Sequence, residues 1–111
     1  MLTIEIPQDV EMMGRLTEEL ERRGVRDGAI ASVIGAVDEC TVSTMPRGDA
    51  SSDVLRTYTD PLEMFGSGEV RDGVPHVHAV FGTADGSAVA GHVHAATART
   101  WFVRVYVIPS A

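Results

Sequence analysis

All four histidines of this 111-residue chain lie in residues 76–94, which read HVHAVFGTADGSAVAGHVH. Apolar and polar or small residues alternate on both sides of Ala84-Asp85-Gly86, and alternation with period two is typical of β-strands joined by a tight turn. The stretch therefore predicts a β-hairpin with one His-Val-His triplet in each strand. Because successive side chains point to opposite faces of a strand, the two histidines of each triplet share a face.

The length of the turn decides whether the two histidine pairs share a face with each other. A two-residue loop would place the pairs on opposite faces of the hairpin. The three-residue loop 84–86 places His78 opposite His92 and His76 opposite His94, so that all four imidazoles share one face. A type I turn followed by a left-handed glycine is a common hairpin loop of this length, and position 86 holds the glycine that it needs.

The apolar residues favour the three-residue loop. In that register the face opposite the histidines carries only apolar or small residues, whereas the other register mixes histidine with valine on both faces. A slip of one residue would turn every side chain of a strand over, so the register with a consistent apolar face is preferred. The residues expected on the core face are Val77, Ala79, Phe81, Val89, Gly91, Val93 and Ala95.

Four imidazoles on one face of a hairpin are candidate metal ligands. Directly opposed residues have Cβ atoms about 4.5–5.5 Å apart, and three imidazoles at this spacing can converge on one ion through bonds of about 2.0–2.1 Å. We take His76, His78 and His92 as the expected ligands, with an open fourth position as in catalytic zinc sites; nickel, copper and iron(II) also accept imidazole. Three roles stay open for His94: a fourth ligand, a hydrogen-bond partner of a ligand, or a proton acceptor. The alternative is that the histidines line a subunit contact and hold no ion.

The rest of the sequence predicts one helix and about six strands. An apolar stripe at Met12, Leu16 and Leu20 indicates an amphipathic helix from an N-cap at Asp9 to about Arg23. No helical pattern separates the later strands, which favours a largely antiparallel sheet and an α+β fold in one domain over residues 1–111. Apart from the two strands of the hairpin, strands are expected at residues 2–6, 29–37, 40–45, around 62–65 and at 100–108, with a loop at 46–53.

A few other side chains are candidates for roles in the site or the core. Glu63 lies on a predicted strand and could point into the histidine pocket as a hydrogen-bond partner or general acid–base group, although a solvated glutamate is an equal alternative. Glu63 and His94 are therefore the catalytic candidates. Trp101 and Phe102 are expected on opposite faces of the last strand, with one of them in the core. No phosphate- or dinucleotide-binding motif is found, so no organic cofactor is expected.

The charge of the chain disfavours direct binding to nucleic acid. Sixteen acidic and nine basic residues give a net charge of −7, and the arginines are scattered, so the surface should repel phosphate. No apolar run approaches the ~20 residues of a membrane span. The N-terminus lacks the basic and apolar segments of a secretory signal, and a single cysteine, Cys40, permits no internal disulfide. We therefore expect a cytoplasmic protein without a membrane partner.

The hairpin, with its Asp-Gly turn followed by Gly91-His92-Val93, resembles the signature of the PPC domain, named for plants and prokaryotes. Ile34-Gly35-Ala36-Val37 is similar to the small-residue turn of that family, and residues 61–68 (PLEMFGSG) are similar to its Phe-Glu-Ile and Ser-x-Gly segment. The resemblance extends from the first strand to Val107. The sequence departs from the family pattern in Ala90, where the family has a glycine, in the additional His94, and in a last strand that lacks the family's glutamate.

The resemblance implies a homotrimer and, as in prokaryotic members, a histidine-bound metal, usually zinc, at positions 76, 78 and 92. We expect a regulatory or ligand-sensing module that takes a small molecule. The similarity of this fold to acetolactate decarboxylase keeps open a metal-dependent lyase acting on a small oxo- or hydroxy-acid. A purely structural trimerising module, or a DNA-associated regulator, is the third possibility. Plant members bind AT-rich DNA through an AT-hook, which needs an Arg-Gly-Arg core, but Pro46-Arg47-Gly48-Asp49 has aspartate at the second arginine.

Overall fold

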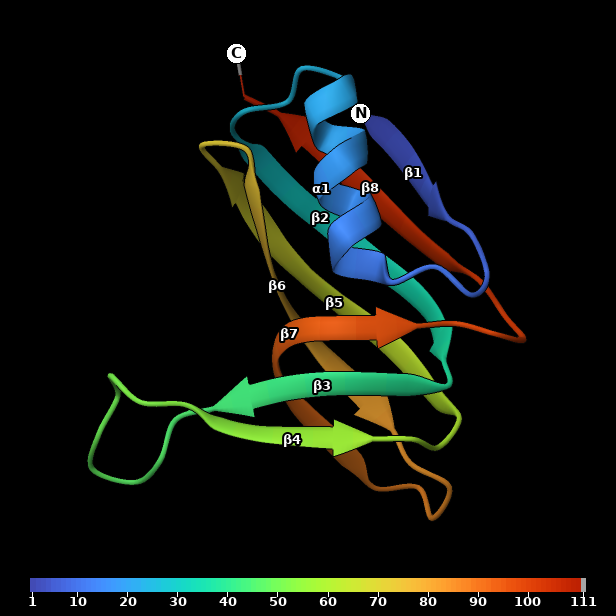
Figure 1. Ribbon diagram of the computed structural model, residues 1–111, viewed down its shortest axis with the longest axis vertical. Coiled ribbons are helices and arrows are strands. Elements are labelled where there is room, and N and C mark those ends of the chain that lie inside the picture. Colours follow the sequence, from blue (N-terminus) through green and yellow to red (C-terminus); the bar gives the residue numbers. More distant parts are fainter. Residues whose placement is uncertain (111) are drawn as a thin grey trace.

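The computed structural model of the chain describes residues 1–110, which form one α-helix and an eight-stranded sheet (Figure 1). The strand order is β1-β8-β2-β5-β6-β7-β3-β4, and each neighbouring pair is antiparallel. The predicted largely antiparallel sheet with one helix is confirmed. The strands are β1 (Leu2–Ile6), β2 (Gly28–Val37), β3 (Glu39–Thr44), β4 (Val54–Tyr58), β5 (Leu62–Arg71), β6 (Val74–Gly82), β7 (Ala88–Thr97) and β8 (Val103–Pro109).

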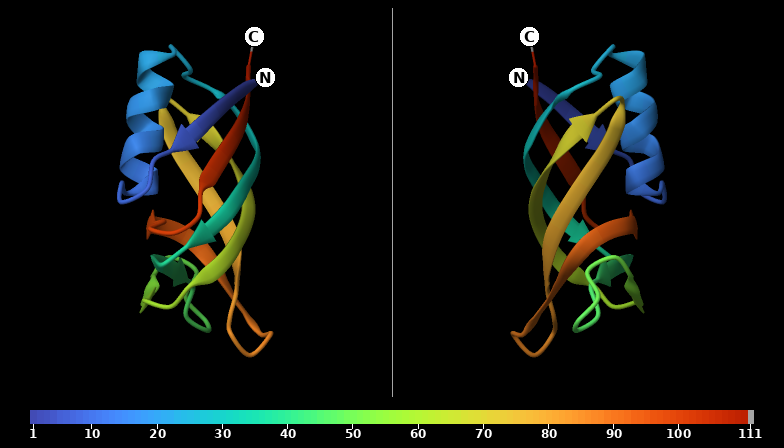
Figure 2. Two further views of the ribbon diagram at one scale, coloured as in Figure 1. Left: turned by 90° about the vertical axis from the view of Figure 1, so that its right-hand side faces the viewer. Right: turned by 90° about the vertical axis from the view of Figure 1, so that its left-hand side faces the viewer.

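The helix α1 (Met12–Arg22) covers one face of the sheet (Figure 2). Its predicted apolar stripe is confirmed, because Met12, Leu16 and Leu20 are all buried in the core. The helix contacts β1, β6 and β7, and the apolar faces of the strands complete the core beneath it. No helix in residues 1–110 is long and apolar enough to cross a membrane.

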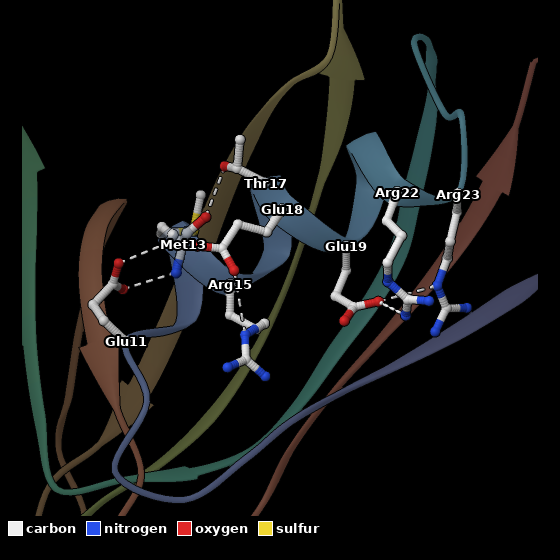
Figure 3. Close-up of polar contacts among 9 residues, drawn as sticks. Glu11, Met13, Arg15, Thr17, Glu18, Glu19, Arg22 and Arg23 are labelled. Atoms are coloured by element: carbon white, nitrogen blue, oxygen red, sulfur yellow. Dashed lines mark hydrogen bonds and ion pairs between the residues drawn. The ribbon is translucent and has the colours of Figure 1, made fainter.

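The helix begins two residues later than predicted, and its cap is Glu11 instead of Asp9. The Glu11 carboxylate accepts hydrogen bonds from the backbone N–H groups of Met13 (2.7 Å) and Gly14 (2.8 Å), as Figure 3 shows. It also accepts one from Ala96 N–H on β7 (3.1 Å). Asp9 instead has a positive φ of 64° and donates its own N–H to a loop carbonyl. The longer glutamate side chain can reach the helix and the sheet together, which an aspartate two residues earlier cannot do.

Replacement of Glu11 by alanine should destabilise the protein by about 2–4 kcal/mol. The estimate combines the loss of a helix cap, typically ~1 kcal/mol, with the cost of leaving the partly buried Ala96 N–H unpaired, about 1–3 kcal/mol. Urea unfolding of Glu11→Ala and of Glu18→Ala, a matched change on the exposed face of the same helix, measures the difference. Equal stabilities of the two variants would show that Glu11 does not join helix to sheet.

Several strand boundaries differ from the prediction. The strand β4 is not among the predicted strands: its side chains are mostly exposed and, within residues 1–110, it pairs only with β3, so it lacks a clear apolar alternation. The strand β8 begins at Val103, and Trp101 and Phe102 both precede it with exposed fractions of 63% and 36%. The prediction that one of these aromatic side chains fills the core is therefore wrong. Val103, Val105 and Val107 already supply the core layer of β8, and all three are buried.

The single cysteine is buried in the core, as expected for a small apolar side chain. Burial raises the pKa of the Cys40 thiol from its ordinary value of 9.0 to about 11. Between these two pH values the unfolded chain loses a proton that the folded chain keeps, so stability should fall as the pH rises through that range. At pH 10.5 the decrease in the free energy of unfolding that is due to Cys40 should be about 2 kcal/mol or less. Urea unfolding at pH 8 and 10.5 should show a larger decrease for the wild type than for Cys40→Ala; equal decreases would contradict the assignment.

Candidate metal centre

The histidine hairpin has the predicted register. His78 pairs with His92 and Val80 pairs with Ala90, and the Thr83 N–H donates to the Ser87 carbonyl across the loop at 2.9 Å. Gly86 has the left-handed φ of 84° that the three-residue loop requires. The four histidines therefore lie on the face of the hairpin opposite the buried residues, of which Val77, Ala79, Phe81 and Val93 are at most 4% exposed.

One detail of the predicted register is wrong: His76 does not pair with His94. The β6–β7 ladder ends at the pair of His78 and His92. Beyond this point β7 pairs with β3, where Thr41 opposes Ala95 but Val42 opposes Val93. His94 is therefore the extra residue of a β-bulge, a feature that bends a strand and changes the direction of a side chain.

The structure brings the histidine rings together around His92. The centre of the His92 ring lies 5.5 Å from that of His78, 5.7 Å from that of His76 and 4.9 Å from that of His94. Two imidazoles that share one tetrahedral ion through bonds of about 2.0–2.1 Å have ring centres roughly 5 Å apart. The spacing of the rings around His92 is therefore suited to a shared ion.

The ring orientations, in contrast, are not yet those of a metal site. Within residues 1–110, no three His, Cys, Asp or Glu side chains are arranged to hold an ion as they stand. The His92 ring is nearly perpendicular to those of His78 and His94, at 86°. His76 and His78 are solvent-exposed, so rotation of their side chains meets little packing. Imidazole is a donor that divalent transition metals accept, and convergence of the nitrogens on one ion would require such a rotation.

His92 is the least exposed of the four histidines, and its surroundings favour the neutral form. Burial lowers the pKa of His92, and the imidazoles of His94, His78 and His76 lower it further, while the Asp53 carboxylate acts in the opposite direction. A metal ligand must be the neutral imidazole. His92 is therefore in the protonation state that a metal needs at neutral pH.

Three of the four histidines, His78, His92 and His94, line a hollow of about 770 Å³, and His76 is not in its described lining. Part of its polar lining follows one cross-strand row, in which Ser67, His78, His92 and Ser43 are successive neighbours on β5, β6, β7 and β3. The hollow also has apolar walls, including Phe65, which lies two positions from Ser67 on β5 and pairs with Val80. The residues of the lining that the sequence pattern did not indicate are Ser43, Thr44, Met45, Asp53, Phe65, Gly66, Ser67, Ala79 and Gly91.

His94 has a specific partner in this hollow. Its Nε2 lies 2.8 Å from the hydroxyl of Ser43, a serine that is only 4% exposed. No signal in the sequence indicates this pair, because 51 residues separate its members and the bulge that brings them together has no pattern of its own.

The hypothesis that Glu63 points into the histidine pocket is wrong. Glu63 opposes Gly82 on β6, and His78 lies four residues from Gly82, about 13 Å along the strand at the usual rise of a β-strand. Glu63 instead lines a second hollow of about 700 Å³, together with Trp101 and Phe102. It is exposed, as the alternative of a solvated glutamate expected.

Comparison with solved structures shows the same fold in proteins of low sequence identity. A protein of Bacteroides thetaiotaomicron, whose name presumes DNA binding, has a TM-score of 0.84 at 23% identity, covering 98% of this chain and 78% of that chain. A metal-containing protein of Archaeoglobus fulgidus has a TM-score of 0.76 at 24% identity, with coverage of 99% and 81%. A plant- and prokaryote-conserved protein of Pyrococcus horikoshii has a TM-score of 0.77 at 15% identity, with coverage of 99% and 78%.

A search of curated proteins found no match to this sequence. The sequence profile of one family, in contrast, matches the chain over residues 1–111. This family is the one that the histidine hairpin and its Asp-Gly turn resemble, and the solved structures above share its fold. The chain belongs to the family of the Plants and Prokaryotes Conserved domain, the PPC domain.

Proposed function

We propose that this chain is a cytoplasmic, homotrimeric PPC-domain protein that holds one zinc-class divalent ion per subunit and binds a small molecule beside it in a regulatory or sensing role. The ligands would be His76, His78 and His92. The observation that carries the proposal is the gathering of the other histidine rings within 5.7 Å of the His92 ring. When bound, such an ion would polarise an oxygen of the small molecule as a Lewis acid.

Two further observations support the metal. His92 favours its neutral form, and three neutral imidazoles with an open position are the donor set of catalytic zinc. The structurally similar protein of Archaeoglobus fulgidus is named as metal-containing. The hollow of about 770 Å³ beside the rings is within the size range of small-molecule sites.

Exposed apolar residues support self-association. Ile34, Phe65, Trp101 and Phe102 are between 36% and 63% exposed and together line the second hollow. Contiguous exposed apolar side chains mark surfaces that contact a partner. Because Phe65 lines both hollows, a neighbouring subunit seated on these residues would also border the histidine site.

The hollow beside the histidines also favours a second candidate function, a lyase-like enzyme acting on a small oxo- or hydroxy-acid. In that case the wild type would turn over such an acid and the His92→Ala variant would not. A regulatory protein would bind the acid without converting it. Assay of a panel of 2-oxo and 2-hydroxy acids with both proteins separates the two functions.

The net charge of −7 argues against direct contact with DNA, even though the similar protein of Bacteroides thetaiotaomicron is presumed in name to bind DNA. We expect no gel shift with duplex DNA at low salt. A shift that weakens as salt increases would favour the DNA-associated regulator instead.

Elemental analysis combined with native mass spectrometry tests the proposal as a whole. The protein, purified without chelator, should carry one zinc-class ion per chain and have the mass of three chains. Trimers without metal would favour the purely structural module, and metal-free monomers would contradict both.

A further inference from the structure

The pair of Ser43 and His94 stands apart from the three expected ligands. Ser43 lies on β3 directly opposite His92 and is buried, although it faces the polar row of the hollow. His94 is the extra residue of the β7 bulge. The Ser43 hydroxyl and His94 Nε2 are 2.8 Å apart, which is a normal hydrogen-bond distance.

The direction of this hydrogen bond follows from the partners of the hydroxyl. In the part of the chain that the structure describes, residues 1–110, His94 Nε2 is the one hydrogen-bond partner of the Ser43 side chain. A buried hydroxyl with one acceptor donates to it, because buried donors without a partner are rarer than acceptors with an unused lone pair. Nε2 therefore accepts, and the proton of the neutral His94 imidazole is on Nδ1.

This tautomer removes His94 from the ligand set. Its Nε2 lone pair accepts from Ser43 and its Nδ1 carries a proton, so neither nitrogen of the neutral ring can bind a metal. The ring lines the hollow and its centre is 4.9 Å from that of His92. The one N–H that this ring can then donate is the one on Nδ1.

We propose that Ser43 positions His94 as a hydrogen-bond donor to an anionic oxygen of the ligand, so that the site takes a small carboxylate or similar oxyanion. This inference rests on the proposed function and names its ligand class. Asp53 lines the same hollow and repels an anion, so the charge of the ion and the His94 donor together must offset that repulsion.

The first experiment needs neither metal nor variant. Nitrogen-15 NMR of the metal-free full chain, at a pH where the imidazole is neutral, should show His94 with its proton on Nδ1. In Ser43→Ala the hydroxyl that donates to Nε2 is absent, so His94 should show a mixture of the Nδ1–H and Nε2–H tautomers. A wild-type His94 with its proton on Nε2 would overturn the inference.

The second experiment measures ligand binding. Acetate is titrated into the cobalt(II)-loaded protein and followed by visible absorption. Ser43→Ala and His94→Ala should keep the cobalt but bind acetate about tenfold more weakly, the effect of one hydrogen bond to a charged group. Ser32→Ala is the matched control, because Ser32 pairs with Tyr106 on the β2–β8 ladder and lies outside the lining of the hollow.

The outcomes separate the inference from the proposed function. A wild-type protein that takes up no cobalt overturns the proposed function and this inference with it. Cobalt uptake with unchanged acetate affinity in Ser43→Ala overturns this inference alone. Loss of cobalt in Ser43→Ala or His94→Ala also overturns it, because His94 would then support the ion itself.

Discussion

Replacement of His92 by alanine is expected to abolish stable binding of a divalent metal. His92 lies at the centre of the histidine cluster, because its ring centre is within 5.7 Å of the ring centres of the other three histidines. It therefore connects the two histidines of β6 with His94 on β7. Removal of one of three ligands leaves two exposed imidazoles on β6. The affinity for zinc should fall by at least a hundredfold, since an effect of 10–100-fold is typical even for partners that only orient a ligand.

The measurement is zinc titration of the chelator-treated protein by calorimetry, with circular dichroism to show that the variant is folded. His94→Ala is the matched control, a histidine of the same strand that should leave zinc affinity within a fewfold of the wild type. If the two variants lose zinc equally, His94 belongs to the ligand set. If neither loses it, the ion is bound elsewhere.

Replacement of Gly68 by alanine should destabilise the protein by about 3 kcal/mol or more, at the upper end of the usual cost of overpacking. A Cβ at this position would lie 1.8 Å from the carbonyl oxygen of His76 and 2.9 Å from its carbonyl carbon. These are backbone atoms, so rotation of a side chain cannot relieve the overlap, and β5 and β6 must move apart. Gly66 approaches the carbonyl of His78 in the same way, at 2.3 Å.

Gly82→Ala is the matched control, because among the described residues 1–110 the only atom that its Cβ would meet within 4 Å is the Glu63 carbonyl oxygen, at 4.0 Å. It should change stability by less than about 1 kcal/mol. Urea unfolding of both variants gives the comparison. Since the displaced backbone carries two expected ligands, Gly68→Ala should also weaken zinc binding. Similar stabilities of the two variants would show that the approach of β5 to β6 is not tightly constrained.

The parts of the fold that could be predicted from sequence are those with a strong local pattern. The alternation on both sides of residues 84–86 determined the hairpin register, because only one loop length leaves a consistent apolar face. The stripe at Met12, Leu16 and Leu20 likewise identified the buried face of α1. The pairing of His78 with His92 follows from this register and needed no long-range information, whereas the place of His94 depends on the bulge between β3 and β7.

The parts that could not be predicted depend on long-range pairing. Ser43 reaches His94 only because β3 pairs with β7 across a bulge, and a bulge leaves no periodic signal in the sequence. The Glu11 carboxylate caps the helix and also accepts a hydrogen bond from Ala96 on β7. The local sequence around the helix contains no signal for this second, distant partner. Trp101 precedes β8 and is exposed, and strand propensity alone cannot distinguish such a residue from a core aromatic.

X-ray absorption at the zinc edge of the zinc-loaded wild-type protein tests the central claim most directly, because it measures the atoms bound to the ion. We expect three imidazole nitrogens at about 2.0–2.1 Å and one further light atom. The same spectrum for His92→Ala should show the loss of imidazole scattering. A wild-type spectrum with only oxygen ligands, or with sulfur at about 2.3 Å, would contradict the three-histidine site.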